Sequence, residues 1–209
     1  IDARISATPT MVDFEADGID VAIRNSRIGG ITDPELIAEK LVDITLLPVV
    51  SPRYLDQFGP LETPADLARA TLIFDESVAT SVDLPTWKDW FAAAGVDNVD
   101  LRRGLRFNSA DHAVDAAVEG AGVLLSYYTI AYEDLRLGRL VCPFDIRLDT
   151  NRAFYFVCPV SSEHRPKVEA FREWLGRERD NMLANPVTSG EAPVPITPPG
   201  RKRSRAVKR

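Results

Sequence analysis

The chain holds very little of the material that metal sites and covalent catalysis need. It has only two histidines, His112 and His164, and two cysteines, Cys142 and Cys158. The cysteines form no C-x-x-C pair and lie in strand-like runs, which is typical of buried thiols in a reducing compartment. Zinc sites and histidine-based triads are therefore not expected. We predict no metal, no cofactor and no catalytic residue.

Long hydrophobic runs are also missing. No apolar stretch approaches the roughly 20 residues that span a bilayer, and no secretory signal is present. The sequence begins with "IDARISAT", without an initiator methionine and inside what reads as a strand. The expectation from these features is a cytoplasmic protein without a membrane partner, whose sequence is part of a longer chain.

Negative charge dominates the body and positive charge the C-terminal end. Residues 185–209 carry six Lys/Arg and one Glu, and residues 1–184 carry a net charge of −11. An acidic body does not attract nucleic acid. The end, "PVTSGEAPVPITPPGRKRSRAVKR", is rich in proline and poor in large apolar residues. We therefore predict that residues 184–209 form a disordered basic tail without contact to the body, either a solvated segment or a weak ligand of phosphate backbones.

Apolar periodicity along the chain predicts strands that alternate with helices, and so an α/β fold with mostly parallel pairing. The predicted strands are 3–7, 20–25, 41–51, 71–76, 101–109, 122–128, 139–144 and 152–159. The predicted helices are a short one within 8–18, then 52–59, 63–70, 84–95, 110–121, 129–138 and 164–183. The rhythm pauses near residues 48–52 and 143–152, which favours two lobes with separate sheets.

The stretch "FNSADHAVDAAVEGAGVLLSYY", residues 107–128, has the strongest local signals. Ser109 is a good helix N-cap, and its hydroxyl is expected to accept from the N–H of Asp111 or His112. In open α/β sheets, strand ends that lead into helix N-termini hold small polar ligands. The residues alone leave two interpretations open, a ligand site or an ordinary capped helix followed by tyrosines in the core.

A set of pieces in a fixed order is more specific than any one of them. The pieces are "DFEADGIDVAIR", "PVVSPRYL", "LETPADLARATLI", "WKDWFAAAG", "FNSADHAVDAAVEGAGVLL", "DLRLGRLVCPFD" and "FYFVCPVSSEHRPKVEAFREWL". Over residues 1–183 the chain resembles the effector-binding domain of LysR-type transcriptional regulators, and most resembles the branch that contains the glycine-cleavage activator. The resemblance extends to no part of the tail.

The resemblance implies a type 2 periplasmic-binding-protein fold, with two α/β lobes joined by two crossover strands. Lobe 1 would take residues 1–50 and 150–183, and lobe 2 residues 51–149, with hinges near 51–52 and 144–152. A small anionic or zwitterionic metabolite would bind between the lobes. The effector-binding residues implied are Thr8, Thr10, Arg24, Ser51, Phe74, Asp75, Asn108, Ser109, Ser126 and Tyr127.

The chain departs from the family pattern at its start. The DNA-binding winged helix-turn-helix, and the first strand and helix of the effector domain, have no counterpart in it. We therefore expect DNA contact only through a missing N-terminal domain, self-association in the full regulator, and unpaired edges beside residues 3–7 and 20–25. A solute-binding protein of a transporter is the alternative with the same fold. An enzyme is disfavoured, because Ser126 lacks a G-x-S-x-G setting.

Overall fold

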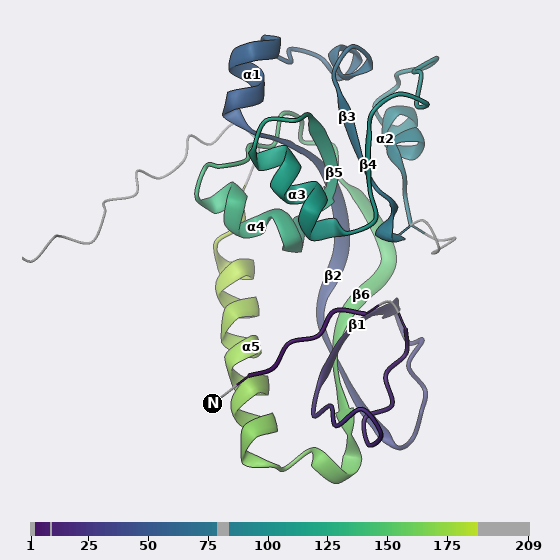
Figure 1. Cartoon of the computed structure of the whole chain (residues 1–209), viewed down its shortest axis with the longest axis vertical. Helices are drawn as coiled ribbons and strands as arrows, with labels where there is room; N and C mark the ends of the chain where they lie inside the picture. Colours follow the sequence, from purple (N-terminus) through teal and green to yellow (C-terminus); the bar gives the residue numbers. More distant parts are fainter. Residues whose placement is uncertain (1–2, 9, 79–83, 188–209) are drawn as a thin grey trace, which may run out of the picture.

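One mixed sheet organises the molecule. The computed structural model describes residues 3–8, 10–78 and 84–187, and its strands form a single six-stranded sheet (Figure 1). The strand order is β1-β6-β2-β5-β3-β4. The bounds are β1 Ala22–Arg27, β2 Leu36–Val50, β3 Leu72–Asp75, β4 Leu105–Phe107, β5 Val123–Tyr127 and β6 Leu148–Pro159. The predicted α/β class is confirmed.

The predicted strand directions are wrong in part. Only β3, β4 and β5 pair in parallel, whereas β1–β6, β6–β2 and β2–β5 are antiparallel. The prediction of separate sheets is also wrong, because β2 and β6 have 15 and 12 residues and run through both parts of the molecule (Figure 1). We call β1, α5 and the strand segments beside them the lower part. The upper part comprises β3 to β5 and helices α1 to α4.

Proline in β2 is tolerated because of where the two long strands separate. The last paired residues of β2 and β6 are Leu46 and Leu148, and Pro48 lies beyond them, opposite Leu125 of β5. A proline cannot donate to a ladder, so it needs a side without a partner strand. Two register shifts, between Lys40 and Val42 and between Asp43 and Thr45, bend β2 just before this point.

The helices follow their local capping signals. Their bounds are α1 Pro52–Phe58, η1 Pro64–Ala68, η2 Glu76–Val78, α2 Trp87–Ala93, α3 Ala110–Val118, α4 Tyr128–Arg136, η3 Val160–Ser162 and α5 Pro166–Ala184. Thr63 and Asp66 form a capping box at η1, which is a 3₁₀ helix instead of the predicted α-helix. Ser51 caps α1 by accepting from the N–H of Tyr54 at 3.3 Å.

Two apolar clusters cover opposite faces of the upper sheet. One gathers around Trp90, fully buried, whose indole N–H donates to the carbonyl of Ile146 at 2.9 Å. The other packs α3 and α4 on the sheet through Ala117 and Leu135. Tight contact fixes Gly122, since a Cβ there would lie 2.2 Å from the carbonyl oxygen of Thr71. The upper part is thereby held as one packed unit.

Three predicted elements are not formed. Residues 3–7 make no strand, and Ile5 is 92% exposed. The outer edge of β1 pairs with no described segment, so residues 3–7 do not join the sheet there. Instead of a helix within 8–18 there is one turn, closed by the carboxylate of Asp13, which accepts from two N–H groups. Of the strand predicted at 139–144, only a single bridge from Val141 to Val50 remains.

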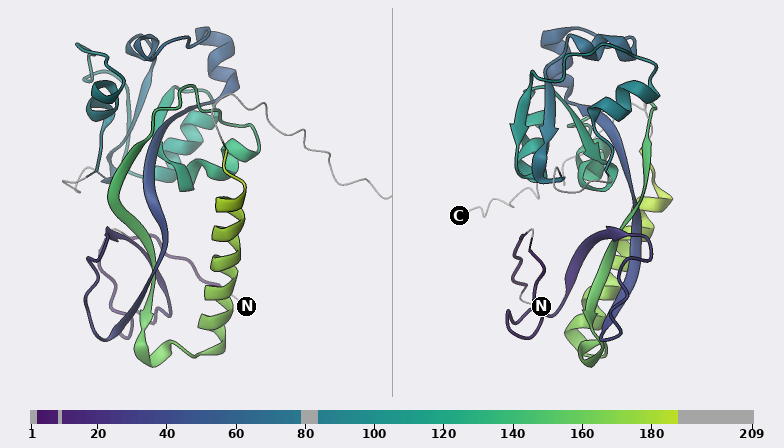
Figure 2. Two further views of the ribbon diagram at one scale, coloured as in Figure 1. Left: turned by 180° about the vertical axis from the view of Figure 1, so that it is seen from behind. Right: turned by 90° about the vertical axis from the view of Figure 1, so that its right-hand side faces the viewer.

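The C-terminal helix joins the two parts of the molecule. Helix α5 starts in the lower part and ends beside α4 (Figures 1 and 2). Beyond it, Tyr132 Oη donates to the carbonyl of Asn185 at 3.1 Å, and the N–H of Val187 donates to Tyr128 Oη at 2.8 Å. The prediction that the tail lacks contact with the body is therefore wrong for residues 185–187. The rest of the predicted tail, 188–209, lies outside the described residues.

Candidate functional site

The carboxyl ends of three parallel strands bring some of the predicted residues to one edge of the sheet. In the register, Asp75 of β3 lies opposite Phe107 of β4, and Ile73 lies opposite Leu124 of β5. Asp75 and Tyr127, and Asn108 just after β4, therefore share this edge. Parallel strands end at a common edge by construction, and such edges are where α/β sheets hold ligands.

Tyr127 is the most unusual residue at this edge. Its side chain is 5% exposed, and no described residue bonds its buried hydroxyl. Its ring packs edge-on against Phe154 of β6, with the centroids 6.0 Å apart. Burial raises the pKa of Tyr127 and the nearby Asp75 carboxylate adds to the rise, while Arg152 opposes it. The hydroxyl therefore stays protonated and able to donate.

Asn25 and Arg152 complete the surroundings of this hydroxyl, and the sequence analysis missed both. Arg152 Nε donates to Asn25 Oδ1 at 2.7 Å, and its Nη2 donates to the Asn25 carbonyl at 3.2 Å. The Asn25 side chain comes near enough to lower the pKa of Tyr127, yet it forms no bond of normal geometry to the hydroxyl. We call Asn25, Tyr127 and Arg152 the Tyr127 cluster.

Arg24, which the resemblance implies as an effector-binding residue, makes its contacts elsewhere. Its guanidinium lies 5.3 Å from the centroid of the Phe14 ring, with a long 3.5 Å bond to the carbonyl of Val12. Side chains alternate along a strand, so Arg24 and its neighbour Asn25 point to opposite faces. The structure thus places Asn25, and not Arg24, in the Tyr127 cluster.

No contact among the described residues brings Thr8, Thr10 or Ser51 to the cluster. The hydroxyls of Thr8 and Thr10 are exposed and bond to each other at 2.8 Å. Ser51 is 2% exposed and lies at the opposite end of β5 from Tyr127, since Val50 pairs with Val123. Its hydroxyl caps α1, as described above, which gives it a structural role.

Phe74, Ser109 and Ser126 have packing or backbone environments. Phe74 lies under the guanidinium of Arg106, 4.3 Å from its ring centroid. Ser109 occupies the N-cap of α3 but makes no side-chain bond there, so the predicted cap hydrogen bond is wrong. Ser126 is buried and donates to the carbonyl of Tyr127 at 3.2 Å. By strand alternation it faces the α3 side of the sheet, away from the Tyr127 ring.

Asp75 keeps part of its bonding capacity. One carboxylate oxygen, Oδ1, accepts from the N–H of Ser77 at 2.9 Å and from its hydroxyl. Within the described part of the chain, Asp75 enters no ion pair. Asn108 is exposed beside it, at the start of α3. The edge therefore offers a carboxylate oxygen, an amide and a neutral hydroxyl.

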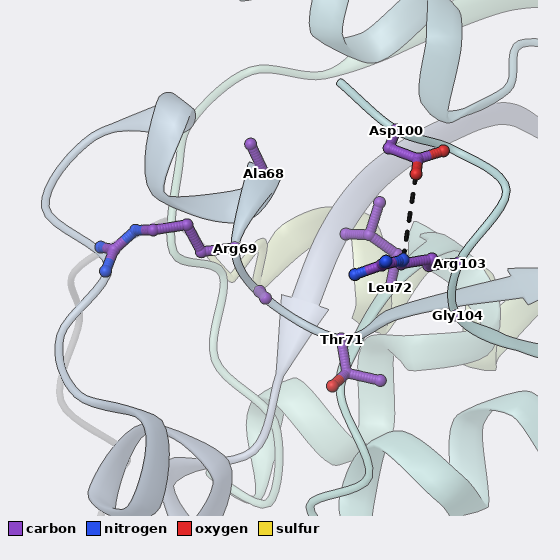
Figure 3. Close-up of a pocket in the computed structure, with 8 residues that line it drawn as sticks. Ala68, Arg69, Thr71, Leu72, Asp100, Arg103 and Gly104 are labelled. Atoms are coloured by element: carbon purple, nitrogen blue, oxygen red, sulfur yellow. Dashed lines mark ion pairs between the residues drawn. The ribbon is translucent and has the colours of Figure 1, made fainter. Parts of the chain in front are cut away.

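A cavity lies at the other end of the same strands. It measures about 350 Å³ and is lined by Ala68, Arg69, Ala70, Thr71, Leu72, Asp100, Arg103 and Gly104 (Figure 3). Arg103 approaches Asp100 at 3.9 Å, and the two arginines are largely exposed. Thr71 and Gly104 precede β3 and β4, so this cavity is separate from the Tyr127 cluster. Strand N-terminal ends carry no helix N-termini here, and the lining lacks a buried polar group.

The described residues form neither a metal-binding site nor a membrane-spanning helix. No group of three or more His, Cys, Asp or Glu side chains there is arranged to hold a metal. Both cysteines are free and buried, as predicted, and burial raises the pKa of Cys142 to about 11. Across the same residues, no helix combines the length and apolarity needed to cross a bilayer.

Comparison with known proteins gives a consistent result. The family model described as "LysR substrate binding domain" matches residues 1–180. The glycine cleavage system transcriptional activator of Escherichia coli K12 is 38% identical over 84% of this chain and 54% of its own length. The regulator DsdC of the same organism is 31% identical over 78% and 52%. The chain thus spans about half the length of these curated relatives.

Solved structures agree. The effector domain of the regulator AmpR from Pseudomonas aeruginosa matches with a TM-score of 0.62 and 25% identity, over 87% of this chain and 82% of that domain. The regulatory domain of CrgA from Neisseria meningitidis, at 19% identity and a TM-score of 0.56, supports the fold alone. The predicted type 2 periplasmic-binding-protein fold is confirmed by this likeness, with the sheet continuous through both parts.

Proposed function

We propose that this chain, which belongs to the LysR substrate-binding domain family, is the effector-sensing module of a transcription regulator and binds its effector at the Tyr127 cluster. The family is one of regulators and not of enzymes. The observation that carries the assignment of the site is the Tyr127 hydroxyl, which is buried and unbonded among the described residues, while its ring packs on Phe154 of the long strand that also carries Arg152.

A small anionic or zwitterionic metabolite suits these surroundings. Buried polar groups are almost always hydrogen-bonded, so an unbonded one at a strand-end edge favours an absent partner. Arg152, held by Asn25, supplies positive charge. Asn108 and the N-terminus of α3 add donors at the rim. A regulator fits better than a transporter component, because the relatives are named as regulators.

We also propose that the two lobes move relative to each other. Lobe 1 takes residues 1–50 with 150–183, lobe 2 takes 51–149, and effector binding changes the angle between them. Self-association, and DNA contact through a helix-turn-helix outside these 209 residues, complete the proposed regulator. Its effect on DNA would follow from the change in lobe angle.

The test is a thermal-shift screen of the 209-residue chain against metabolites grouped by charge: carboxylates, amino acids, nucleobases and neutral sugars. A compound present at 100 times its Kd stabilises the folded state by about 2.7 kcal/mol. For a domain of this size that corresponds to a Tm rise of several degrees. We expect at least one charged class to produce such a rise.

Two matched variants place the binding site. Asn108→Trp adds bulk at an exposed position beside the Tyr127 cluster, and Arg69→Trp adds the same bulk beside the cavity of Figure 3. The first should reduce the Tm rise, and the second should leave it unchanged. A screen with no stabilising compound would refute effector sensing, and the reverse pattern in the variants would move the site to the cavity.

A further inference from the structure

The chain leaves helix α5 at a proline and then contacts the upper part of the molecule. The helix ends at Ala184, and Pro186 follows two residues later. The residue before a proline is disfavoured in helical backbone. Asn185 closes the helix, because its N–H and its Nδ2 both donate to the carbonyl of Asn181, at 3.1 and 2.9 Å. The end of α5 is thus capped from within, and the contacts of residues 185–187 with the upper part are additional to it.

Two tyrosines of α4 match the spacing of this segment. Tyr132 Oη donates to the carbonyl of Asn185 at 3.1 Å, and Tyr128 Oη accepts from the N–H of Val187 at 2.8 Å. Four helical residues rise by about 6 Å along the axis, and two residues of extended chain cover about 6.6 Å. The two rings meet edge to face, with their centroids 5.8 Å apart, which orients both hydroxyls. Helix α4 therefore presents two hydroxyls at the separation that the backbone of a non-helical segment requires.

Arg147 connects the same segment to the place where the chain crosses between the two parts. It directly precedes β6, one of the two long strands that run through both parts. Its guanidinium lies 5.1 Å from the centroid of the Tyr128 ring, and its Nη2 donates to the carbonyl of Val187 at 3.1 Å. The Val187 side chain packs against the apolar cluster of α3 and α4. The N–H, the carbonyl and the side chain of Val187 are thereby all bound by the upper part.

We propose that residues 185–187 are a strap that holds the lower and upper parts at one angle. Helix α5 packs on the lower part through Val168 and Leu175. Among the described residues, the hydrogen bonds that tie its far end to the upper part are the three made by residues 185 and 187. The other two connections, β2 and β6, pair with register shifts and so resist bending less than a regular ladder does. The strap goes beyond the proposed function, because it restrains the angle with no ligand bound.

The first experiment is hydrogen exchange of the Val187 amide, followed by NMR on the 209-residue chain. Tyr132→Phe removes the bond to Asn185 and leaves the acceptor of the Val187 N–H in place. If the strap opens as one unit, the Val187 amide should exchange about 2- to 10-fold faster in this variant, because one hydrogen bond fewer opposes opening. Tyr155→Phe is the matched control. It removes a hydroxyl that accepts from the N–H of Gly29 in the lower part, at 3.3 Å, and should leave the Val187 amide unchanged.

The second experiment measures the angle through the distance between two spin labels, by double electron–electron resonance. The labels are attached at Glu35→Cys, just before β2 in the lower part, and at Asp56→Cys in α1, both at exposed positions. The two native cysteines are buried, so the introduced thiols react selectively. With the strap intact we expect a narrow distribution of distances. Tyr128→Phe combined with Tyr132→Phe should widen this distribution, and Tyr155→Phe should not.

Two results would overturn the strap. Unchanged exchange of the Val187 amide in Tyr132→Phe would show that its contacts open independently. An unchanged distance distribution in the double variant would show that residues 185–187 merely follow the helix and do not restrain the angle. Circular dichroism verifies folding of the double variant, and each single replacement is measured beside it, so loss of folding in the double variant does not remove the test. No ligand enters either experiment, so failure of the metabolite screen would count against the proposed function alone, and failure here against the strap alone.

Discussion

Two adjacent tyrosines provide a direct test of the candidate site, because the same substitution should act on them with opposite signs. Tyr127 Oη is buried and bonded to no described residue, whereas Tyr128 Oη accepts from the N–H of Val187 at 2.8 Å. Replacing either with phenylalanine removes one oxygen and keeps the ring. The comparison therefore isolates the hydrogen bonding of each hydroxyl.

The expected magnitudes come from the cost of unmet hydrogen bonds. A buried polar group without a partner costs about 1–3 kcal/mol, and a typical formed bond contributes about 0.5–1.5 kcal/mol. Tyr127→Phe should raise the free energy of unfolding by about 1 kcal/mol in the ligand-free chain. Tyr128→Phe should lower it by about 1 kcal/mol. At this chain length, each change corresponds to about 2–4 °C in Tm.

Urea denaturation followed by circular dichroism measures both variants beside the wild type. The m-value should stay constant, because neither substitution changes the surface exposed on unfolding. If Tyr127→Phe destabilises the protein as much as Tyr128→Phe does, the Tyr127 hydroxyl is already bonded. The candidate site would then lack the free donor on which its assignment rests.

Three further predictions concern the stability of the folded chain. Trp90→Phe should destabilise the protein by about 2–4 kcal/mol, since the indole is fully buried and bonded, while Trp174→Phe, at a 46% exposed position, should stay within about 0.5 kcal/mol in the same denaturation assay. Gly122→Ala should destabilise by about 1–3 kcal/mol because its Cβ meets a carbonyl oxygen, and Gly176→Ala in α5 should stabilise by about 0.5–1 kcal/mol because nothing lies near it; a destabilised Gly176→Ala would contradict this. The pKa of Asp66 is lowered to about 2 by its bonds in the capping box, so its stabilising effect is present above the unfolded pKa near 4 and is lost as the pH falls toward 2; Asp66→Asn should therefore melt below wild type at pH 7 and together with it near pH 2.

Local signals in the sequence were sufficient to predict most helices and strands of the upper part. Gly95 and Gly138 end predicted helices with positive φ values, and the capping box at Thr63 forms. These features depend on a few neighbouring residues, so a sequence displays them. Ser109 is the exception, because its hydroxyl occupies the predicted N-cap position without making the bond.

The direction of the strands and the choice of neighbouring strands could not be predicted from the sequence. The run at residues 3–7 has the composition of a strand, yet it does not pair with the open edge of β1 or with any other described strand. The parallel pairing predicted from alternation holds only among β3, β4 and β5. Elsewhere the pairing is antiparallel, including that of the two long strands β2 and β6.

At the candidate site, too, some residues could be predicted from the sequence, and others depend on how distant strands pair. Asp75 and Tyr127 were indicated by the resemblance, but Asn25 and Arg152 meet across 127 residues of chain, through the pairing of β1 with β6. The resemblance implies Arg24 as well, and the one-residue alternation of the strand turns Arg24 to the face opposite Asn25. The sequence shows which side chains suit a polar ligand. It does not show which face of the sheet each of them lies on.

Three segments connect the lower and upper parts, and they differ in how they can yield to a change of angle. The strands β2 and β6 are irregular where they pass from one part to the other, with register shifts at residues 40–42 and 43–45 of β2. Irregular ladders bend more easily than regular ones.

Helix α5 is held below by Lys167, whose ammonium lies 2.6 Å from Asp20, and above by the bonds of residues 185 and 187 to α4. A helix is stiff along its axis, so a rotation of one part against the other has to be taken up at its two ends. The Tyr127 cluster draws Asn25 and Arg152 from strands of the lower part and Tyr127 from the upper part. The ligand proposed to bind there would therefore act on the bendable strands directly, and through α5 on residues 185 and 187.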